Sequence, residues 1–252
     1  MLVNILNSNV SIVPSIHRLT QNHHLDKSIT DKVAQADGVL FERDLDQSLQ
    51  PPPRTSLMFS VAQSGQVPGN LSGLWSGSAI GRNISELQNL TFAEIADVVD
   101  CGIAQNTFLV HQKYGVDLRL WNQVPPAKRG AIQQAADLLA AMAPYPDLEQ
   151  VAELSYVCDV AKRKSDFRAE LDAWSRGDVV ELGQLLDTIY LRTPTRANEV
   201  LFKRNHIMLQ AIMNKLSDSE HAYVFVVGAA HVVGTHGLLN MLVATGLQYQ
   251  VV

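Results

Sequence analysis

The chain has 252 residues, of which 46% are hydrophobic and 18% are charged, a balance that excludes disorder as its main state. Its 15 glycines and 10 prolines are too few for a collagen-like or low-complexity chain. The net charge of −5 gives no general basic surface for nucleic acid or anionic lipid. Cys101 and Cys158 lack the spacing of a zinc finger, and two cysteines do not make a disulfide scaffold.

Residues 221–252 contain no Lys, Arg, Asp or Glu, a pattern that also occurs in membrane-spanning helices. Gly228, Gly234, Gly237 and Asn240 interrupt this stretch, so a strand, a turn and a helix fit it better. The first six residues contain no basic segment of a secretory signal. We therefore expect no membrane span and a cytoplasmic location for the chain as given, or an exported location if a native leader has been removed.

The amino-terminal residues predict a β-loop-α-β unit. Residues 10–13 form a short apolar strand that Pro14 is expected to end. Leu25, Ile29 and Val33 recur every four residues, as on one face of a helix. Residues 38–41 then form a buried strand, after which residues 51–53, all proline, end the unit.

The middle of the chain, approximately residues 84–216, is predicted to be helical, after a surface loop or lid at residues 60–83. Thr91 and Glu94 have the spacing of a capping box, which starts a helix that runs to about residue 104. Gly177 is expected to end one helix and Asp178 to start another. Further helices are predicted at residues 106–114, 127–142, 147–164, 166–176 and 196–216.

The carboxyl-terminal residues return to an α/β pattern, with strands at 223–227 and 247–251 and a helix at 238–245 between them. The sequence therefore predicts one α/β domain over residues 1–252. Its mixed or parallel sheet is built from amino- and carboxyl-terminal β-turn-α-β units, and the helices of the middle are an insertion. Parallel neighbours would bring their carboxyl-end turns to one edge, where open α/β folds bind ligands.

Two histidines, His17 and His231, each follow an apolar strand end by four positions, with small residues between. Both imidazoles would then project from the carboxyl edge of the sheet. A neutral imidazole can ligate a metal, and its pKa near 6.5 allows proton exchange at neutral pH. The alternative is that each is a turn histidine whose hydrogen bonds are satisfied by the backbone.

Glu42 directly follows the strand at residues 38–41, so its carboxylate is expected at the rim of the core. A buried carboxylate is costly unless it is paired, hydrogen-bonded or bound to a metal, and burial raises its pKa toward that of a useful general base. The alternative is a salt bridge to Arg43 or to another cation at the rim.

On a helical wheel of 100° per residue, Val200, Ile207 and Ala211 form an apolar stripe on the helix predicted at residues 196–216. Arg204 lies within this stripe, roughly 40° from Val200. Its guanidinium needs a bidentate partner there, which is either a structural carboxylate such as Glu42 or an anionic group of a substrate. Asn205 lies at the edge of the stripe and is suited to orient a histidine or a ligand carbonyl.

The common nucleotide and hydrolase motifs are absent, namely the P-loop, G-x-S-x-G, H-E-x-x-H and the dinucleotide fingerprint. Residues 234–237 open a helix between two glycines, so free backbone amides there are a candidate anion site.

Several segments resemble, in the same order, the TraB/PrgY/GumN family, which includes the Tiki proteases. They lie within residues 10–46 and 166–252, about half of the chain. The segments are SIH at 15–17, ADGVLFE at 36–42, WSRGD at 174–178, KRN at 203–205 and VFVVGAAHVVG at 224–234. In the first of them, Pro14 stands where the family usually has glycine, so a turn that needs a positive φ cannot form there.

The resemblance implies a fold like that of erythromycin esterase and the haem-binding ChaN proteins, with two G-x-x-H motifs and a strand-end glutamate in one cleft. Carried over, it suggests His17 and His231 as metal ligands, Glu42 as ligand or general base, and Arg204 as an anion or oxyanion stabiliser, with Asn205 beside it. The expected cofactor is a divalent metal, Mn, Co or Zn, which would activate water and polarise a carbonyl.

The function expected from these residues is that of a metal-dependent hydrolase, possibly a peptidase, with a small peptide or small molecule as its ligand. The alternative is a non-catalytic binding or inhibitory protein that sequesters a small peptide or signal, as the family's pheromone-inhibitor members suggest. No nucleic acid partner is expected.

Overall fold

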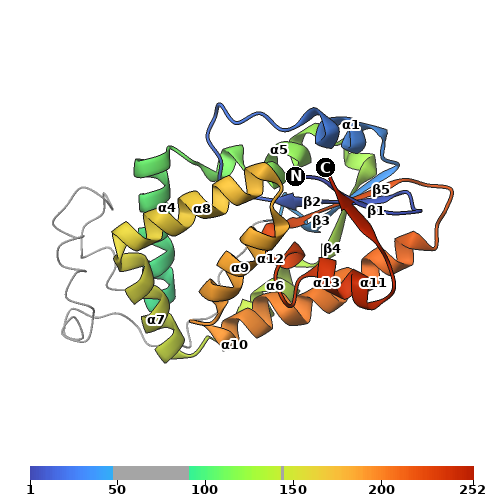
Figure 1. The fold of residues 1–252 in the computed structure, drawn as a ribbon. Helices are drawn as coiled ribbons and strands as arrows, with labels where there is room; N and C mark the ends of the chain where they lie inside the picture. The colour runs from blue at the N-terminus through green and yellow to red at the C-terminus, as the bar shows by residue number, and fades with distance from the viewer. Residues whose placement is uncertain (48–90, 143–144) are drawn as a thin grey trace.

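The computed structural model of the chain describes residues 1–47, 91–142 and 145–252. The tri-proline segment at 51–53 and the predicted loop or lid at 60–83 lie outside the described residues. The described part is an α/β structure, in which a central sheet carries helices on both faces and a further group of helices lies to one side (Figure 1).

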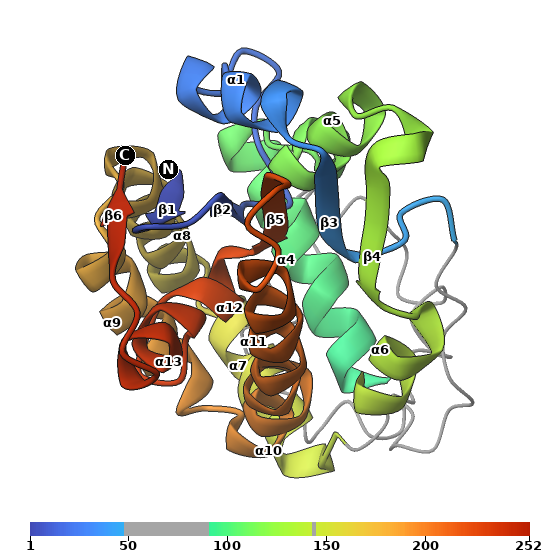
Figure 2. The same cartoon turned by 90° about the vertical axis from the view of Figure 1, so that its right-hand side faces the viewer.

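Within the described residues the sheet has six strands in the order β4-β3-β5-β2-β1-β6 (Figure 2). In chain order they are β1 (Val3–Ile5), β2 (Val10–Ser15), β3 (Gly38–Arg43), β4 (Arg129–Gln133), β5 (Tyr223–Gly228) and β6 (Tyr249–Val251). Strands β4, β3, β5 and β2 are parallel, whereas β1 is antiparallel to β2 and β6. The prediction of an α/β fold with a mixed sheet is confirmed; five of the six strands come from the two chain ends, and β4 comes from the middle of the chain.

The three central strands β2, β5 and β3 are rich in apolar residues because helices cover both of their faces. All six residues of β2 are buried. Ser15 stands opposite Gly228, and Phe41 stands opposite Val226, so the carboxyl ends of the three strands lie at one edge. Residues that follow these ends are therefore brought to the same edge of the sheet.

Pro14 lies inside β2, where the sequence predicted the end of the strand. It stands opposite Val227, and its carbonyl oxygen accepts a hydrogen bond of 2.8 Å from the Trp174 indole. The N–H and C=O of one strand residue point to the same side, so the N–H that proline lacks would face Trp174 and not β5. On that side β1 pairs with β2 only as far as Ile12. The strand loses no ladder hydrogen bond, which explains why the proline is tolerated.

Helices cover the two faces of the sheet (Figure 2). One face carries α1 (Lys27–Gln35) and α5 (Val116–Gln123), and the other carries α11 (Lys203–Leu216) and α13 (Leu238–Ala244). The short helix α12 (Ala229–Val232) follows β5 directly. As the four-residue spacing predicts, α1 buries Ile29 and Val33 against the core.

Beside the sheet stand α4 (Phe92–Phe108), α7 (Asp147–Cys158) and α8 (Val160–Arg176), which we call the helical lobe (Figure 1). The capping box of Thr91 and Glu94 is confirmed at the start of α4. Gly177 ends α8 with a φ of 72°, and Asp178 caps α9 (Val179–Tyr190), as predicted. The lobe has an apolar cluster of its own, made mainly of Phe92, Ile95, Val99, Leu154 and Val157.

The predicted helix at residues 127–142 is wrong in its first half. A 3-10 turn at Pro126–Lys128 and strand β4 stand there, and only α6 (Ala135–Met142) is helical. Strand β4 pairs with β3, with Arg43 opposite Gln133. Pairing with a distant strand decides the conformation of such a short segment, and no local pattern reveals it.

Two other helix boundaries differ from the prediction. Helix α4 continues to Phe108 and ends at Leu109, whose φ is 54°, so that only a 3-10 helix at Gln112–Tyr114 remains of the helix expected at 106–114. The break expected after residue 164 falls at Asp159 instead, because its side chain accepts a hydrogen bond from the amide of Lys162 and caps α8.

The long helix predicted at residues 196–216 is divided into α10 (Pro194–Ala197), a π-helical turn (Asn198–Phe202) and α11. A π turn holds an extra residue and therefore rotates the residues that follow it. As a result, α11 buries Arg204 and Asn205, while Ile207, which the wheel placed in the apolar stripe, is 49% exposed.

The two ends of the described chain lie side by side, because β6 pairs with β1. Leu2 and Val252 exchange backbone hydrogen bonds of 2.9 and 2.8 Å. No helix among the described residues is both long and apolar enough to cross a bilayer.

Candidate functional site

The side chains of His17, Glu42 and His231 converge on Gly228 at the carboxyl edge of the sheet. A Cβ atom at Gly228 would lie 3.2 Å from Nε2 of His17, 3.5 Å from Oε2 of Glu42 and 3.6 Å from Cδ2 of His231. The φ of Gly228 is −52°, so glycine is needed here for space and not for its conformation. Residues from opposite ends of the chain thus meet at one point.

No residue at 14–17 or 228–231 has a positive φ, so neither histidine needs the turn that Pro14 excludes. Among the described residues, positive φ occurs at Asn7, Leu109, Gly177, Gly234 and Gly246. Pro14 is therefore compatible with the placement of His17 beside Gly228.

Glu42 is held by Arg204, whose Nη2 donates to Oε1 at 2.5 Å. The amide of Gly228 donates to Oε2 at 3.4 Å. Burial alone would raise the pKa of this carboxyl, but His231 in its protonated form, the cationic Arg204 and protonated His17 hold the pKa well below its usual range. Arg43, the alternative partner, donates to the backbone carbonyls of Asp44 and Gln47. Glu42 is therefore ionised at neutral pH.

Arg204 is 3% exposed and directs its N–H groups at protein acceptors. Besides Glu42, it donates from Nε to Oε1 of Gln133 at 2.8 Å and from Nη1 to the carbonyl of Val200 at 2.9 Å. Nη1 also lies 3.4 Å from Nε2 of His231. Of the two partners expected for Arg204, the structure thus contains the structural carboxylate. The carbonyl of Val200 belongs to the π-helical turn.

Asn205 orients His231. Its Nδ2 donates to the carbonyl of His236 at 2.7 Å, which fixes the amide so that Oδ1 faces Nδ1 of His231 at 2.6 Å. Nδ1 must then carry the hydrogen. Burial lowers the pKa of His231. The charge of Glu42 raises this pKa and the charge of Arg204 lowers it, and the net shift is downward. The imidazole is therefore neutral at neutral pH, and its Nε2 atom lies 3.5 Å from Oε1 of Glu42.

His17 is oriented by Asp117, in the first turn of α5, whose Oδ2 lies 2.9 Å from Nδ1. The side chain is 55% exposed. Partial burial opposes its charge, but the hydrogen bond and charge of Asp117 and the charge of Glu42 outweigh this, so the pKa is raised. A Cβ at Gly115 would lie only 2.4 Å from the carbonyl oxygen of His17, so α5 approaches the histidine this closely only with glycine there.

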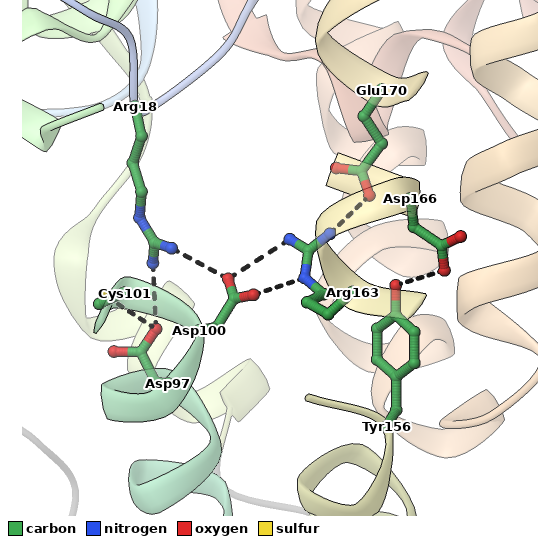
Figure 3. A network of polar contacts seen from close by, with 8 residues as sticks. All are labelled: Arg18, Asp97, Asp100, Cys101, Tyr156, Arg163, Asp166 and Glu170. Atoms are coloured by element: carbon green, nitrogen blue, oxygen red, sulfur yellow. Dashed lines mark hydrogen bonds and ion pairs between the residues drawn. The ribbon is translucent and has the colours of Figure 1, made fainter. Parts of the chain in front are cut away.

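The segment after His17 is tied to the helical lobe (Figure 3). Arg18 donates to Asp100 at 3.0 Å and to Asp97 at 3.2 Å, both on α4. Asp100 also accepts from Arg163 of α8, at 2.5 and 3.4 Å, and Arg163 donates to Glu170 at 2.9 Å. Helix α8 thus holds the chain on both sides of His17, at Pro14 through Trp174 and at Arg18 through this network.

A cavity of about 180 Å³ opens between His17 and Glu42. This space is enough for the reacting group of a ligand but not for a large ligand. Its walls include polar residues and the apolar residues Phe41 and Leu138; the polar ones are Ser15, His17, Glu42, Arg43, Gln112 and Asp117.

The candidate anion site at residues 234–237 is occupied by a carboxylate of the chain itself. Asp187 of α9 accepts hydrogen bonds from the amide of Thr235 at 3.0 Å and from its hydroxyl at 2.8 Å. The backbone amide that a bound anion would need is therefore used to hold α9 against this loop.

The donor atoms of the site suit a divalent metal in kind. Both histidines have Nδ1 engaged by another residue, as metal-binding imidazoles with an outer partner do. Nε2 of His231 lies 3.5 Å from Oε1 of Glu42, and Nε2 of His17 borders Gly228 together with Oε2 of Glu42. Imidazole and carboxylate suit Zn, Mn and Co. In the arrangement that the structure gives residues 1–47, 91–142 and 145–252, however, no three His, Cys, Asp or Glu side chains surround a common ion position.

Sequence reasoning identified His17, Glu42, Arg204, Asn205 and His231, and the structure brings all five together. It missed Asp117 and Gln133, which come from the helical middle. An aspartate in the first turn of a helix ordinarily complements the helix dipole, so nothing in the sequence marks Asp117 as the partner of His17.

A family model described as the TraB/PrgY/gumN family matches residues 7–251, nearly the whole chain. No curated protein and no solved structure matches the chain.

Proposed function

We propose, since the chain belongs to the TraB/PrgY/gumN family, that it is a metal-dependent hydrolase of small substrates such as short peptides. The observation that carries this proposal is the convergence of two imidazole Nε2 edges and an ionised carboxylate around Gly228. Each of the three side chains is oriented by a further residue, which is the support that a catalytic site needs.

In this proposal His17, Glu42 and His231 hold a Mn, Co or Zn ion. Such an ion supplies Lewis-acid chemistry, lowering the pKa of water and polarising a carbonyl. The low pKa of Glu42 makes it a weak base at neutral pH, so its charge serves better in holding a cation than in accepting a proton.

Arg204 and Asn205 act through the other residues of the site. Because its N–H groups face protein acceptors, we assign Arg204 the role of keeping Glu42 ionised and fixed, in place of direct contact with an anion. Asn205 fixes the tautomer of His231, so that Nε2 carries the lone pair that a metal requires.

The second candidate is a binding or inhibitory protein that sequesters a small peptide or signal. It is favoured by one observation: the candidate ligands, as they stand in the described residues, do not surround an ion position. In that case the cavity between His17 and Glu42 would hold a ligand group without cleaving it.

Metal content separates the two candidates. The purified protein is loaded separately with Zn, Mn and Co, freed of excess metal, and analysed by elemental mass spectrometry. We expect one ion per chain, lost in His17→Ala, His231→Ala and Glu42→Gln. His221→Ala is the matched control, because His221 also pairs with an aspartate, Asp218, at 3.0 Å, on the surface away from the site.

Hydrolysis is then assayed by mass spectrometry on a mixture of short peptides, with and without a chelator. Cleavage that stops on chelation and in Glu42→Gln supports the hydrolase. A metal-free protein that cleaves nothing, and whose His17→Ala and Glu42→Gln variants remain metal-free and folded, would contradict it in favour of the binding protein.

A further inference from the structure

Ser15 has a buried hydroxyl with no hydrogen-bond partner in the part of the chain that the structure describes. It is the last residue of β2 and is 2% exposed. A buried hydroxyl that makes no hydrogen bond is destabilising, and such groups in native proteins call for a water, an ion or a ligand as partner. The hydroxyl of Ser15 is therefore available to a partner other than the described residues, such as a water or a ligand.

The sheet register places Ser15 beside the convergence point of the site. Ser15 stands directly opposite Gly228, and side chains of directly paired strand residues lie on the same face of a sheet. On that face, the space left by the missing side chain of Gly228 is bordered by Nε2 of His17 and Oε2 of Glu42. Ser15 also lines the cavity between those two residues.

The chemistry of the cavity indicates what the hydroxyl does. Glu42 and Asp117 contribute carboxylate oxygens, which only accept hydrogen bonds when ionised. Arg43 already donates from Nη1 to the carbonyls of Asp44 and Gln47. The O–H of Ser15 is one of the donors available to a ligand oxygen in the cavity. The carboxylates of Glu42 and Asp117 oppose the positive charge of Arg43, so the cavity offers no excess of positive charge to a negatively charged ligand group.

We propose that Ser15 is a ligand-contacting residue whose Oγ–H donates a hydrogen bond to an uncharged carbonyl oxygen bound between His17 and Glu42. The proposal rests on the proposed function only in taking that carbonyl as part of the substrate; binding itself requires neither metal nor cleavage. It makes Ser15 a determinant of which group the site accepts.

Ser11 provides a matched control on the same strand. It is also buried, but its hydroxyl donates to Oδ1 of Asn4 at 2.9 Å. Ser11→Ala breaks a hydrogen bond, so its melting temperature should fall. Ser15→Ala removes only an unsatisfied group, so the melting temperature of the ligand-free protein should be unchanged or higher. A fall as large as that of Ser11→Ala would show that Ser15 has a structural partner, and would overturn the proposal.

Binding is tested with acetamide and acetate, two probes of equal size that differ in charge. The imidazole resonances of His17 are followed by NMR on histidine-labelled protein. Acetamide should shift them saturably and more tightly than acetate, and Ser15→Ala should weaken acetamide binding by about three- to tenfold, the worth of one hydrogen bond. Ser11→Ala should bind acetamide like the unmodified protein.

Three outcomes would overturn the proposal: no saturable shift with acetamide, equal acetamide affinity in Ser15→Ala, or tighter binding of acetate. Metal content is measured on the same Ser15→Ala protein, where it should be unchanged. A metal-free protein that still shows Ser15-dependent acetamide binding would contradict the hydrolase and leave this inference standing.

Discussion

Two buried arginines in this molecule are used in different ways. Arg163, in the helical lobe, is 8% exposed and lies between the carboxylates of Asp100 and Glu170. Arg204, at the carboxyl edge of the sheet, is 3% exposed and pairs with Glu42. Both satisfy the rule that a buried charge is paired, yet the charged groups around the two arginines differ in whether they border a cavity.

In the lobe, the charges balance one another across two helices and the segment after His17. Asp100 accepts from both Arg18 and Arg163, and Glu170 accepts from Arg163 (Figure 3). Around Arg204, only one oxygen of Glu42 is taken by the guanidinium, while Oε2 of Glu42 and Nε2 of His17 border open space. The comparison teaches that charged groups that bridge helices away from a cavity form a structural cluster, and charged groups that border a cavity form a candidate site.

The largest expected effect comes from Arg163→Met. It leaves Asp100 and Glu170 without their shared cation, and breaking a buried pair in this way costs about 3–5 kcal/mol. Urea denaturation should show this loss. The control, Arg168→Met on the exposed side of the same helix, loses only a contact with the Phe108 ring and should change the unfolding free energy by at most about 1 kcal/mol. If Arg163→Met changes the unfolding free energy no more than the control does, the network of Arg163, Asp100 and Glu170 does not stabilise the lobe.

Gly228→Ala should damage the site while sparing the fold. The added methyl group would lie 3.2 Å from Nε2 of His17, a side-chain atom that can move, so the loss of stability should be at the lower end of the about 1–3 kcal/mol typical of overpacking. Metal or probe binding should be lost. Gly115→Ala brings its methyl group to 2.4 Å from a backbone oxygen and should cost more stability. If denaturation shows a larger loss of stability for Gly228→Ala than for Gly115→Ala, the prediction is wrong.

Asp117→Asn should weaken metal binding by about 10- to 100-fold, because an outer partner that orients a metal-binding histidine contributes this much. Its effect on stability should be small, since His17 is 55% exposed and exposed pairs contribute about 0–1 kcal/mol. Metal titration of the variant measures the change, and Asp218→Asn, at the surface pair with His221, is the control. Equal affinities in the two variants would remove Asp117 from the site.

The smallest effects are opposite pH dependences in the two regions. The pKa of Glu42 is lowered below 4.5, so its contribution to stability is complete above pH 4.5 and is lost as the pH falls toward its folded-state pKa. The pKa of Glu170 is raised above 4.5, chiefly by burial, so its contribution is complete below pH 4.5 and is lost as the pH rises through its folded-state pKa.

Unfolding free energies measured from pH 3 to pH 7, a range of about two units around the reference pKa, test this contrast. The difference between the unmodified protein and Glu42→Gln should shrink as the pH falls. The difference between the unmodified protein and Glu170→Gln should shrink as the pH rises. Slopes of the same sign for both variants would contradict the assignment of the two carboxyls.

Much of the site could be predicted from sequence because its residues follow strand ends. The apolar runs before His17, Glu42 and His231 identify buried strands, and parallel pairing brings their ends together. The cation within an apolar helical stripe pointed to Arg204, since a charge at such a position requires a partner. The helical wheel wrongly placed Ile207, which is exposed, on the buried side, because no residue pattern predicts the π-helical turn.

The contributions of the helical middle could not be predicted. Gln133 reaches Arg204 only because residues 129–133 form a strand that pairs with β3, and that pairing overrides a locally helical pattern. Asp117 and Arg163 act through contacts with residues far away in the sequence, and the residue spacing does not indicate these contacts. The role of residues 60–83 and the single-domain organisation stay predictions.

The pairing of β6 with β1 joins the two halves of the site at the chain ends, since the backbones of Leu2 and Val252 are hydrogen-bonded to each other. A circular permutant that links Val252 to Met1 and opens in the helical middle would place His231 and His17 on one short, uninterrupted stretch of polypeptide. In this topology the half of the molecule that carries His17 and His231 is a contiguous unit whose two parts lie at opposite ends of the sequence, and the lobe is the segment inserted into it.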